Sequence, residues 1–210
     1  MKPVPRLCRI STALARSRGY NLIAGIDEVG IGAWAGPVVA GIVVVPPDYC
    51  LPGLDDSKRL TEVKRVRLAA QIKETALDVS VAFIPPQTID ETNILFADML
   101  AMEKVVGQLS LAPDVILIDG RSAPLLSYPT ITIIKGDRRS APIAAASIVA
   151  KVWRDEFMER LAQEYPQYGW EENKGYGTAG HQAAIQVHGP CKEHRMSYRP
   201  IRDFTDKKLF

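Results

Sequence analysis

Five short apolar runs, rich in Val and Ile, alternate along the chain with longer segments of mixed character. The runs are bounded by Gly, Pro or charged residues, which is typical of buried β-strands. We predict strands over residues 22–26, 38–45, 78–84, 115–118 and 131–134.

The segments between these strands predict helices. Residues 61–76 mix charged and apolar positions as a surface helix does. Thr88 and Glu91 have the T-x-x-E spacing of a capping box, which predicts that a helix begins there and ends near residues 107–110. Its apolar face would consist of Ile94, Ala97, Ala101, Val105 and Leu109.

A long helix is predicted to begin at Ser140 and to run through Leu161. Serine caps the free N–H groups of a helix start, and Pro142 is tolerated in the first turn. Residues 143–152 are apolar on nearly all sides, so we expect this half of the helix to lie buried across the sheet.

The alternation of strands and helices indicates the α/β class. A chain of 210 residues is long enough for one well-packed domain and short for two independent cores. We expect an N-terminal extension at residues 1–21, a main domain at 22–164, and a small helical or irregular extension at 165–210 that is rich in Gly, Pro, Tyr and His.

The composition, with 47% hydrophobic and 24% charged residues, excludes fibrous and disordered proteins. A net charge of only +2 does not mark the whole molecule as a binder of polyanions. The distribution is more informative, because the basic residues are clustered and can form one basic face. The clusters are Lys58-Arg59, residues 64–67, residues 135–139 and residues 192–202, of which 64–67 fits a solvated helix face.

The three cysteines, Cys8, Cys50 and Cys191, are odd in number and far apart, so we expect reduced thiols in a cytoplasmic protein. The N-terminus lacks the uninterrupted apolar core of a signal peptide, and no later run reaches membrane-spanning length. We therefore expect no membrane contact, and nothing in the sequence demands more than a monomer.

Acidic residues stand at the ends of three predicted strands: Asp27-Glu28 after the first, Asp119 after the fourth and Asp137 after the fifth. Strand ends of an α/β sheet converge on one rim, where such carboxylates can supply the oxygen ligands that Mg²⁺ prefers. Any single acid could instead cap a turn or a helix, and for Asp137 this is a serious alternative. Two adjacent acids that interrupt an apolar strand favour a functional role.

Neighbours on a regular strand point to opposite faces, so Asp27 and Glu28 cannot both reach one site from ideal strand geometry. The sequence Gly30-Ile31-Gly32 suggests that the chain already turns at Glu28. Glu28 could contribute through its side chain, its backbone carbonyl or a water molecule.

Several ordered motifs between about residues 22 and 204 together resemble the successive signatures of type II ribonucleases H. They are GIDEVG at 25–30, GPVVA at 36–40, LDDSK at 54–58, IDG at 118–120, KGD at 135–137, IAAASIVAKV at 143–152 with Arg154-Asp155, NKGYGT at 173–178, His181 and His194-Arg195.

The resemblance implies an RNase H-like fold, with a mixed five-stranded sheet flanked by helices and a C-terminal helical part that contributes to the substrate groove. It implies that Asp27, Glu28, Asp119 and Asp137 are the catalytic acids and metal ligands. It places Tyr176 against the sugar at an RNA–DNA junction. The further substrate contacts that we expect are Gly30, Ile31, Gly32, Lys58, Lys135, Ser140 and His194.

The implied activity is endonucleolytic hydrolysis of the RNA strand of RNA/DNA hybrids, including ribonucleotides embedded in DNA, in replication and repair. Two ions, Mn²⁺ or Mg²⁺, would activate a water and stabilise the leaving 3′-oxygen, so no protein nucleophile is needed. The products would carry 5′-phosphate and 3′-hydroxyl ends. The 2′-OH then distinguishes RNA from DNA.

One residue departs from the family pattern. The family usually has Gly-Arg-Gly after the Asp-Glu pair, whereas this chain has Gly30-Ile31-Gly32. The two glycines preserve a close backbone approach to the ribose, but any phosphate contact of the arginine side chain is missing.

Three alternative functional readings stay open. A hybrid-binding protein without chemistry is disfavoured, because binding alone selects against acids beside phosphates. Another nuclease or recombinase on this fold is disfavoured by the tyrosine-bearing C-terminal segment. A zinc site at His181, His188, Cys191 and His194 matches no standard spacing.

Two further residue roles also stay open. Asp155 fits either a supporting carboxylate or a structural charge. The final Leu209-Phe210 faintly resembles peptides that bind a sliding clamp, although a frayed tail explains it more simply.

Overall fold

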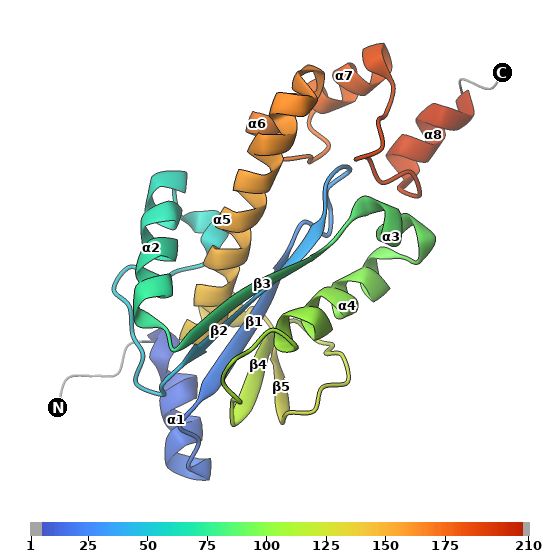
Figure 1. The fold of residues 1–210 in the computed structure, drawn as a ribbon. Coiled ribbons are helices and arrows are strands. Elements are labelled where there is room, and N and C mark those ends of the chain that lie inside the picture. Colours follow the sequence, from blue (N-terminus) through green and yellow to red (C-terminus); the bar gives the residue numbers. More distant parts are fainter. Residues whose placement is uncertain (1–5, 208–210) are drawn as a thin grey trace.

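The computed structural model describes residues 6–207 and contains one mixed five-stranded sheet with the order β3-β2-β1-β4-β5 (Figure 1). The strands are β1 (Ile23–Val29), β2 (Val38–Val45), β3 (Asp78–Ile84), β4 (Val115–Asp119) and β5 (Thr130–Ile133). β2 pairs antiparallel with both β1 and β3, whereas β4 lies parallel to β1 and β5 lies parallel to β4. The predicted mixed sheet is therefore confirmed.

Helices cover both faces of this sheet. On one face lies α4 (Ile94–Val106), whose Ala97, Ala101 and Val105 pack against inward residues of β1, β2 and β4. On the other face lies the long α5 (Ala141–Glu164), flanked by α2 (Glu62–Thr75). The sheet is thus buried on both sides, which explains why β2 is a continuous apolar run instead of an alternating one.

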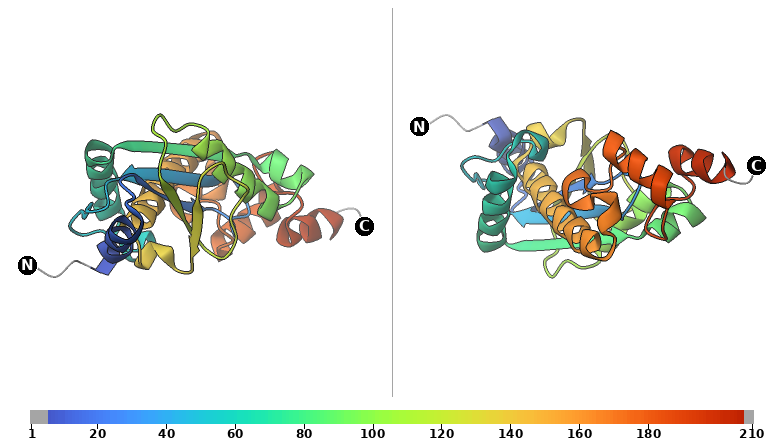
Figure 2. Two further views of the ribbon diagram at one scale, coloured as in Figure 1. Left: turned by 90° about the horizontal axis from the view of Figure 1, so that it is seen from below. Right: turned by 90° about the horizontal axis from the view of Figure 1, so that it is seen from above.

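The small helices extend from opposite ends of the molecule. At one end lies α1 (Arg9–Arg18), and at the other lie α7 (Ala179–His188) and α8 (Arg199–Lys207), reached through α6 (Trp170–Asn173), as two further views show (Figure 2). The predicted helical character of the C-terminal extension is confirmed. None of the helices within residues 6–207 is long and apolar enough to span a bilayer.

Close contact between α5 and the sheet depends on glycine. A Cβ at Gly25 would stand 2.1 Å from the backbone carbon of Pro142, and a Cβ at Gly41 would stand 2.8 Å from the Ala146 carbonyl. The predicted burial of residues 143–152 is confirmed. The predicted helix start is also confirmed, but the Ser140 hydroxyl makes no cap hydrogen bond.

The capping box predicted at Thr88 is wrong. Thr88 lies inside a short helix, α3 (Pro86–Glu91), and the chain breaks before α4 begins. Asn93 caps α4, because its side chain accepts a hydrogen bond from the Phe96 N–H at 2.9 Å. Asparagine is among the strongest N-cap residues, so it defines the helix start five residues after Thr88.

The prediction of three reduced thiols is wrong for two of the cysteines. Cys8 and Cys50 form a disulfide with their Cα atoms 6.0 Å apart, while Cys191 is free. The two cysteines are 42 residues apart, so the sequence gives no sign that they pair. They come together because α1 lies beside the loop that follows β2. Thr12 of α1 reaches the same loop and donates to the Pro47 carbonyl at 3.4 Å.

Candidate active site at the strand ends

Asp27 and Glu28 occupy the last part of β1 and remain within regular strand pairing, opposite Gly41 and Ala40 of β2. The expected turn at Glu28 is therefore wrong, since the strand continues to Val29. The two side chains interact with opposite layers. Asp27 lies near Ser147 of α5, which opposes the rise of its pKa, whereas Glu28 lies near Asp98 of α4, whose charge raises the pKa of Glu28.

Asp119 ends β4 beside β1, because the parallel register aligns Ile118 with Ile26. Its Oδ1 accepts a hydrogen bond from the Gly136 N–H at 2.6 Å, which joins the ends of β4 and β5. The chain then turns away at Gly120, whose φ of 104° is readily adopted only by glycine.

Asp137 follows β5 in a short 3-10 helix, Gly136–Arg138, and is only 8% exposed. The alternative that it caps α5 is not what the structure shows, because α5 has no side-chain cap. Lys135 precedes it with a left-handed φ of 56° and is exposed to solvent. The turn therefore buries the acid and leaves the lysine outside.

The four acids form one electrostatic cluster. Burial is the largest cause that raises the pKa of Asp27 to about 7, and repulsion from Asp119 and Asp137 adds to it. Burial also raises the pKa of Glu28 to about 9, with repulsion from Asp27 next in size. Burial and Asp119 raise the pKa of Asp137. Within the described part of the chain, none of the four forms an ion pair.

This donor set fits a hard divalent cation by its chemistry. Crowded carboxylates that form no ion pair are stabilised by a bound cation, which favours their charged forms. In residues 6–207, no three His, Cys, Asp or Glu side chains already stand as a finished metal site. The strand ends bring the acids close enough to repel one another, although their side chains do not form such a group in this structure.

A cavity of about 310 Å³ opens beside the cluster. It is lined by Glu28, Val29, Ser57, Lys58, Ser147, Lys151 and Tyr176. The predicted catalytic Glu28 and the predicted substrate residues Lys58 and Tyr176 therefore share one cavity, although they are far apart in sequence. The Tyr176 ring lies 5.3 Å from the Arg154 guanidinium carbon and 5.9 Å from Lys151 Nζ.

The Lys58 loop is held by a residue to which the sequence assigned no role. Asp56 is 1% exposed and accepts a hydrogen bond from the Lys58 N–H at 2.9 Å. Its other oxygen accepts two hydrogen bonds from the Arg138 guanidinium, at 3.0 and 2.8 Å. Since Arg138 follows Asp137 directly, this ion pair joins the lysine loop to the acid turn.

The loop between β1 and β2 is held from behind by two buried arginines. Arg154 donates to the carbonyls of Pro37 and Ala35, at 3.0 and 3.1 Å. Arg195 donates to the Ile31 carbonyl at 2.9 Å, and the Tyr198 hydroxyl donates to the same oxygen at 2.5 Å.

The glycines of this loop differ in their surroundings. Gly30 is buried with a φ of 95°, and a Cβ there would stand 2.4 Å from Arg154 Nε. Gly32 is exposed with open space around it. The Ile31 side chain packs against the core beneath α4.

Two predicted substrate contacts lie in the interior instead. His194 and Ser140 are both 0% exposed, so neither side chain faces solvent where a nucleic acid would bind. His194 bonds to His181 and Cys191, and this group forms no metal site among the described residues. Asp155 pairs with Lys151 at 2.6 Å and Arg65 at 3.7 Å, and Lys151 in turn lines the cavity of Glu28 and Tyr176.

Asp98 was missed in the sequence. It is 6% exposed, and its buried Oδ1 has no hydrogen-bond partner. The signal was available, because Asp98 stands four residues after Ile94 and three before Ala101 on the predicted apolar face of α4.

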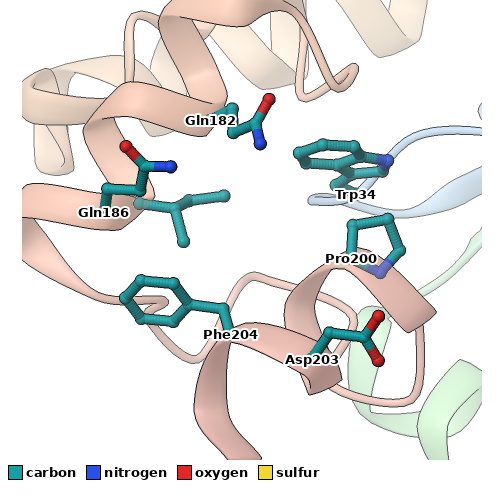
Figure 3. A pocket seen from close by; sticks show the side chains of 7 residues that line it. Trp34, Gln182, Gln186, Pro200, Asp203 and Phe204 are labelled. Atoms are coloured by element: carbon teal, nitrogen blue, oxygen red, sulfur yellow. The ribbon is translucent and has the colours of Figure 1, made fainter. Parts of the chain in front are cut away.

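A second cavity, of about 300 Å³, lies between α7, α8 and Trp34 (Figure 3). Gln182 and Gln186 of α7 face Phe204 and Asp203 of α8 across it. None of the four acids lines this cavity, so it is separate from the acidic cluster.

Comparison with known proteins identifies a family. A family model described as ribonuclease HII matches residues 24–201. The ribonuclease HII of Bacillus mycoides (strain KBAB4) is 50% identical over 192 residues, which cover 91% of this chain and 74% of that protein.

Solved structures share the fold. Ribonuclease H2 from Pyrococcus horikoshii OT3 superposes with a TM-score of 0.73 at 26% identity, covering 89% of this chain and 98% of that one. Bst-RNase HIII in complex with Mn²⁺ gives a TM-score of 0.72 at 20% identity, covering 92% and 72%. The predicted RNase H-like architecture is therefore confirmed.

Proposed function

Because the chain belongs to the ribonuclease HII family and is thus a nuclease that hydrolyses phosphodiester bonds, we propose that it cuts RNA strands at ribonucleotides paired with DNA. Its substrates would be RNA/DNA hybrids and DNA duplexes with embedded ribonucleotides. The observation that carries this proposal is the cluster of four acids at the strand ends, beside a cavity that Glu28, Lys58 and Tyr176 line.

The four acids are the proposed holders of Mn²⁺ or Mg²⁺, with two ions when substrate is bound. Asp27, Asp119 and Asp137 stand close enough for mutual repulsion to raise the pKa values of Asp27 and Asp137, beyond the effect of burial. Bound ions would supply an activated water and would stabilise the leaving oxygen. The chain would supply the oxygen ligands, and cleavage would leave 5′-phosphate and 3′-hydroxyl ends.

Neighbouring side chains would bind the nucleic acid. Lys58 and Lys135 are exposed on the two segments that flank the cluster, where each can contact a phosphate. Tyr176 is partly exposed in the cavity and presents its ring to a sugar. The backbone of residues 30–32 is the proposed reader of the ribose 2′-OH, since this group alone distinguishes RNA from DNA at one nucleotide.

We further propose that the enzyme acts as a monomer in the cytoplasm, where it can reach replicating DNA. A weak contact with a sliding clamp through Leu209-Phe210 is also proposed from the sequence, although these residues lie outside the described part of the chain. Deleting them should abolish retention on an immobilised clamp. Unchanged retention would remove this partner.

Cleavage of end-labelled duplexes tests the substrate class. Three duplexes of equal length would be incubated with the protein in the presence of Mg²⁺ or Mn²⁺. They are an all-DNA duplex, a DNA duplex with one ribonucleotide, and an RNA/DNA hybrid. We expect cleavage of the last two and no cleavage of the first, with phosphate on the 5′ end of the downstream product. Equal cleavage of the all-DNA duplex, or no cleavage of any duplex, would contradict the proposal.

A further inference from the structure

A pair of buried histidines stands behind the cavity that contains Tyr176. His181 lies in the first turn of α7, and His194 lies in the segment between α7 and α8; both are 0% exposed. Their Nε2 atoms are 3.1 Å apart. Buried imidazoles this close need partners for every ring nitrogen, because an unpaired buried polar group costs free energy.

The partners determine which nitrogen carries each proton. The Trp170 indole N–H can only donate, and it donates to His181 Nε2 at 3.1 Å, so that nitrogen has no proton. The Cys191 backbone N–H donates to His194 Nδ1 at 3.0 Å, so that nitrogen has none either. His194 must then be protonated at Nε2, from which it donates to His181 Nε2, whose single lone pair it shares with Trp170.

The remaining nitrogen points toward the proposed substrate site. His181 Nδ1 must carry the proton, and it lies 3.0 Å from the Tyr176 carbonyl, to which it donates. A second proton on either ring would put an N–H group opposite another N–H donor, at a distance where one of the two groups must accept. Burial lowers the pKa of His181, and burial lowers the pKa of His194 to about 4, in agreement with two neutral rings.

Other contacts restrict the same segment. The Thr178 N–H donates to the Tyr176 carbonyl at 2.8 Å, and the Tyr176 N–H donates to Asn173 at 2.9 Å. Gly177 lies flat against the Trp34 ring, since a Cβ there would stand 2.2 Å from it. The residues next to the Tyr176 carbonyl are therefore held in place. The hydrogen bond from His181 fixes the direction of this carbonyl, and with it the direction in which the Tyr176 ring points.

We propose that His181 and His194 form a neutral relay of fixed tautomers that positions Tyr176, so that both are positioning residues for recognition of the RNA–DNA junction. The proposal rests on the proposed function. In this proposal His194 does not make the direct substrate contact that the sequence led us to expect, but acts on the substrate through His181 and Tyr176. The relay runs from the Cys191 N–H through His194 and His181 to the Tyr176 carbonyl.

Two substitutions at His181 separate positioning from stability. In His181→Gln, the amide oxygen can replace Nε2 as the acceptor for Trp170 and His194, but the donor to Tyr176 is lost. In His181→Asn, the amide nitrogen can replace Nδ1 as the donor to Tyr176, but Trp170 and His194 lose their acceptor. His188→Asn on the same helix is the control, because His188 is exposed.

The readouts are the melting temperature and kcat/KM on the single-ribonucleotide duplex relative to the continuous hybrid. We expect His181→Gln to melt near the wild-type temperature and to lose about tenfold in this ratio, the scale of one hydrogen bond. His181→Asn should have a lower melting temperature than His181→Gln, but its kcat/KM ratio should stay closer to that of the wild type. If the ratio instead follows the melting temperature across the variants, the histidines are merely structural and the proposal fails.

A double-mutant cycle and a spectrum complete the test. If His181 acts through Tyr176, then His181→Gln should cause little further loss in a Tyr176→Ala background; additive losses would overturn the proposal. Nitrogen-15 NMR of the wild type should show a proton on Nδ1 of His181 and on Nε2 of His194, and the opposite tautomers would also overturn it. If the wild type cleaves neither duplex, the proposed function is refuted. The NMR measurement of the tautomers would still test the relay in that case.

Discussion

Asp56 and Arg138 form a two-bond ion pair that joins the loop of Lys58 to the turn of Asp137, with the carboxylate almost completely buried. Arg138 is partly exposed, so its charge matters less here than the geometry of its planar guanidinium, which fixes two segments relative to each other.

We therefore predict that Asp56→Asn lowers kcat/KM about tenfold, because it weakens the link that places Lys58 beside the acids. Steady-state cleavage of the hybrid measures this. Asp55→Asn is the matched control, since the Asp55 carboxylate forms an ion pair with the exposed Arg59 and asparagine can still accept the hydrogen bond from the Asp56 N–H. Equal effects of the two substitutions would show that the ion pair does not position the site.

Asp98→Asn should stabilise the metal-free protein at high pH. Burial raises the pKa of Asp98 to about 6, so the folded state retains a proton that the unfolded state releases above about pH 4. Stability therefore falls as pH rises from about 4 to 6 and stays lower above that range.

Substitution by asparagine removes this loss, because the amide carries no charge to bury. We expect a gain of about 2 kcal/mol at pH 8 and almost none near pH 4 in urea unfolding with chelator present. A gain of equal size at both pH values would contradict ionisation of Asp98 as its cause.

Ile31→Arg tests the departure from the family pattern. The Ile31 carbonyl is held by Arg195 and Tyr198, so its backbone should keep its position while the side chain changes. The Ile31 side chain packs against the core, so an arginine, whose charge stays in water, should turn outward to where it can contact phosphate. We predict a severalfold gain in kcat/KM on the single-ribonucleotide duplex and a smaller gain on the hybrid. An equal change in kcat/KM on both substrates, or a decrease on both, would contradict a role of this side chain in recognising the single ribonucleotide.

Gly25→Ala should destabilise the fold by about 3 kcal/mol or more, because its methyl group would overlap the backbone of Pro142, which cannot move without shifting α5. Thermal or urea unfolding measures the change. Gly180→Ala is the control, since that glycine of α7 has open space around its Cα. Similar destabilisation by both substitutions would mean that close helix–sheet contact is not the cause.

Much of the fold was predictable from local patterns, because strands buried on both faces are continuous apolar runs and the acids interrupt them. The motifs also predicted that Lys58 and Tyr176 would share a site with Glu28, and the structure brings them into one cavity.

Other features depend on partners distant in the sequence. The Cys8–Cys50 disulfide requires the docking of α1, and the burial of His194 requires three aromatic residues from other segments. The break before α4 was missed because Thr88 and Asn93 are both good caps, and only the folded chain shows which one is used.

The most direct test of the account is the metal dependence of cleavage by the wild type, Asp27→Asn and Asp119→Asn on the RNA/DNA hybrid. None of the four acids forms an ion pair among the described side chains, and their proposed joint role is to hold metal ions. We predict cleavage with Mg²⁺ or Mn²⁺, none with chelator, and a loss of at least about a thousandfold in each variant, which must still melt cooperatively. Cleavage that persists in chelator, or variants as active as the wild type, would contradict the central claim.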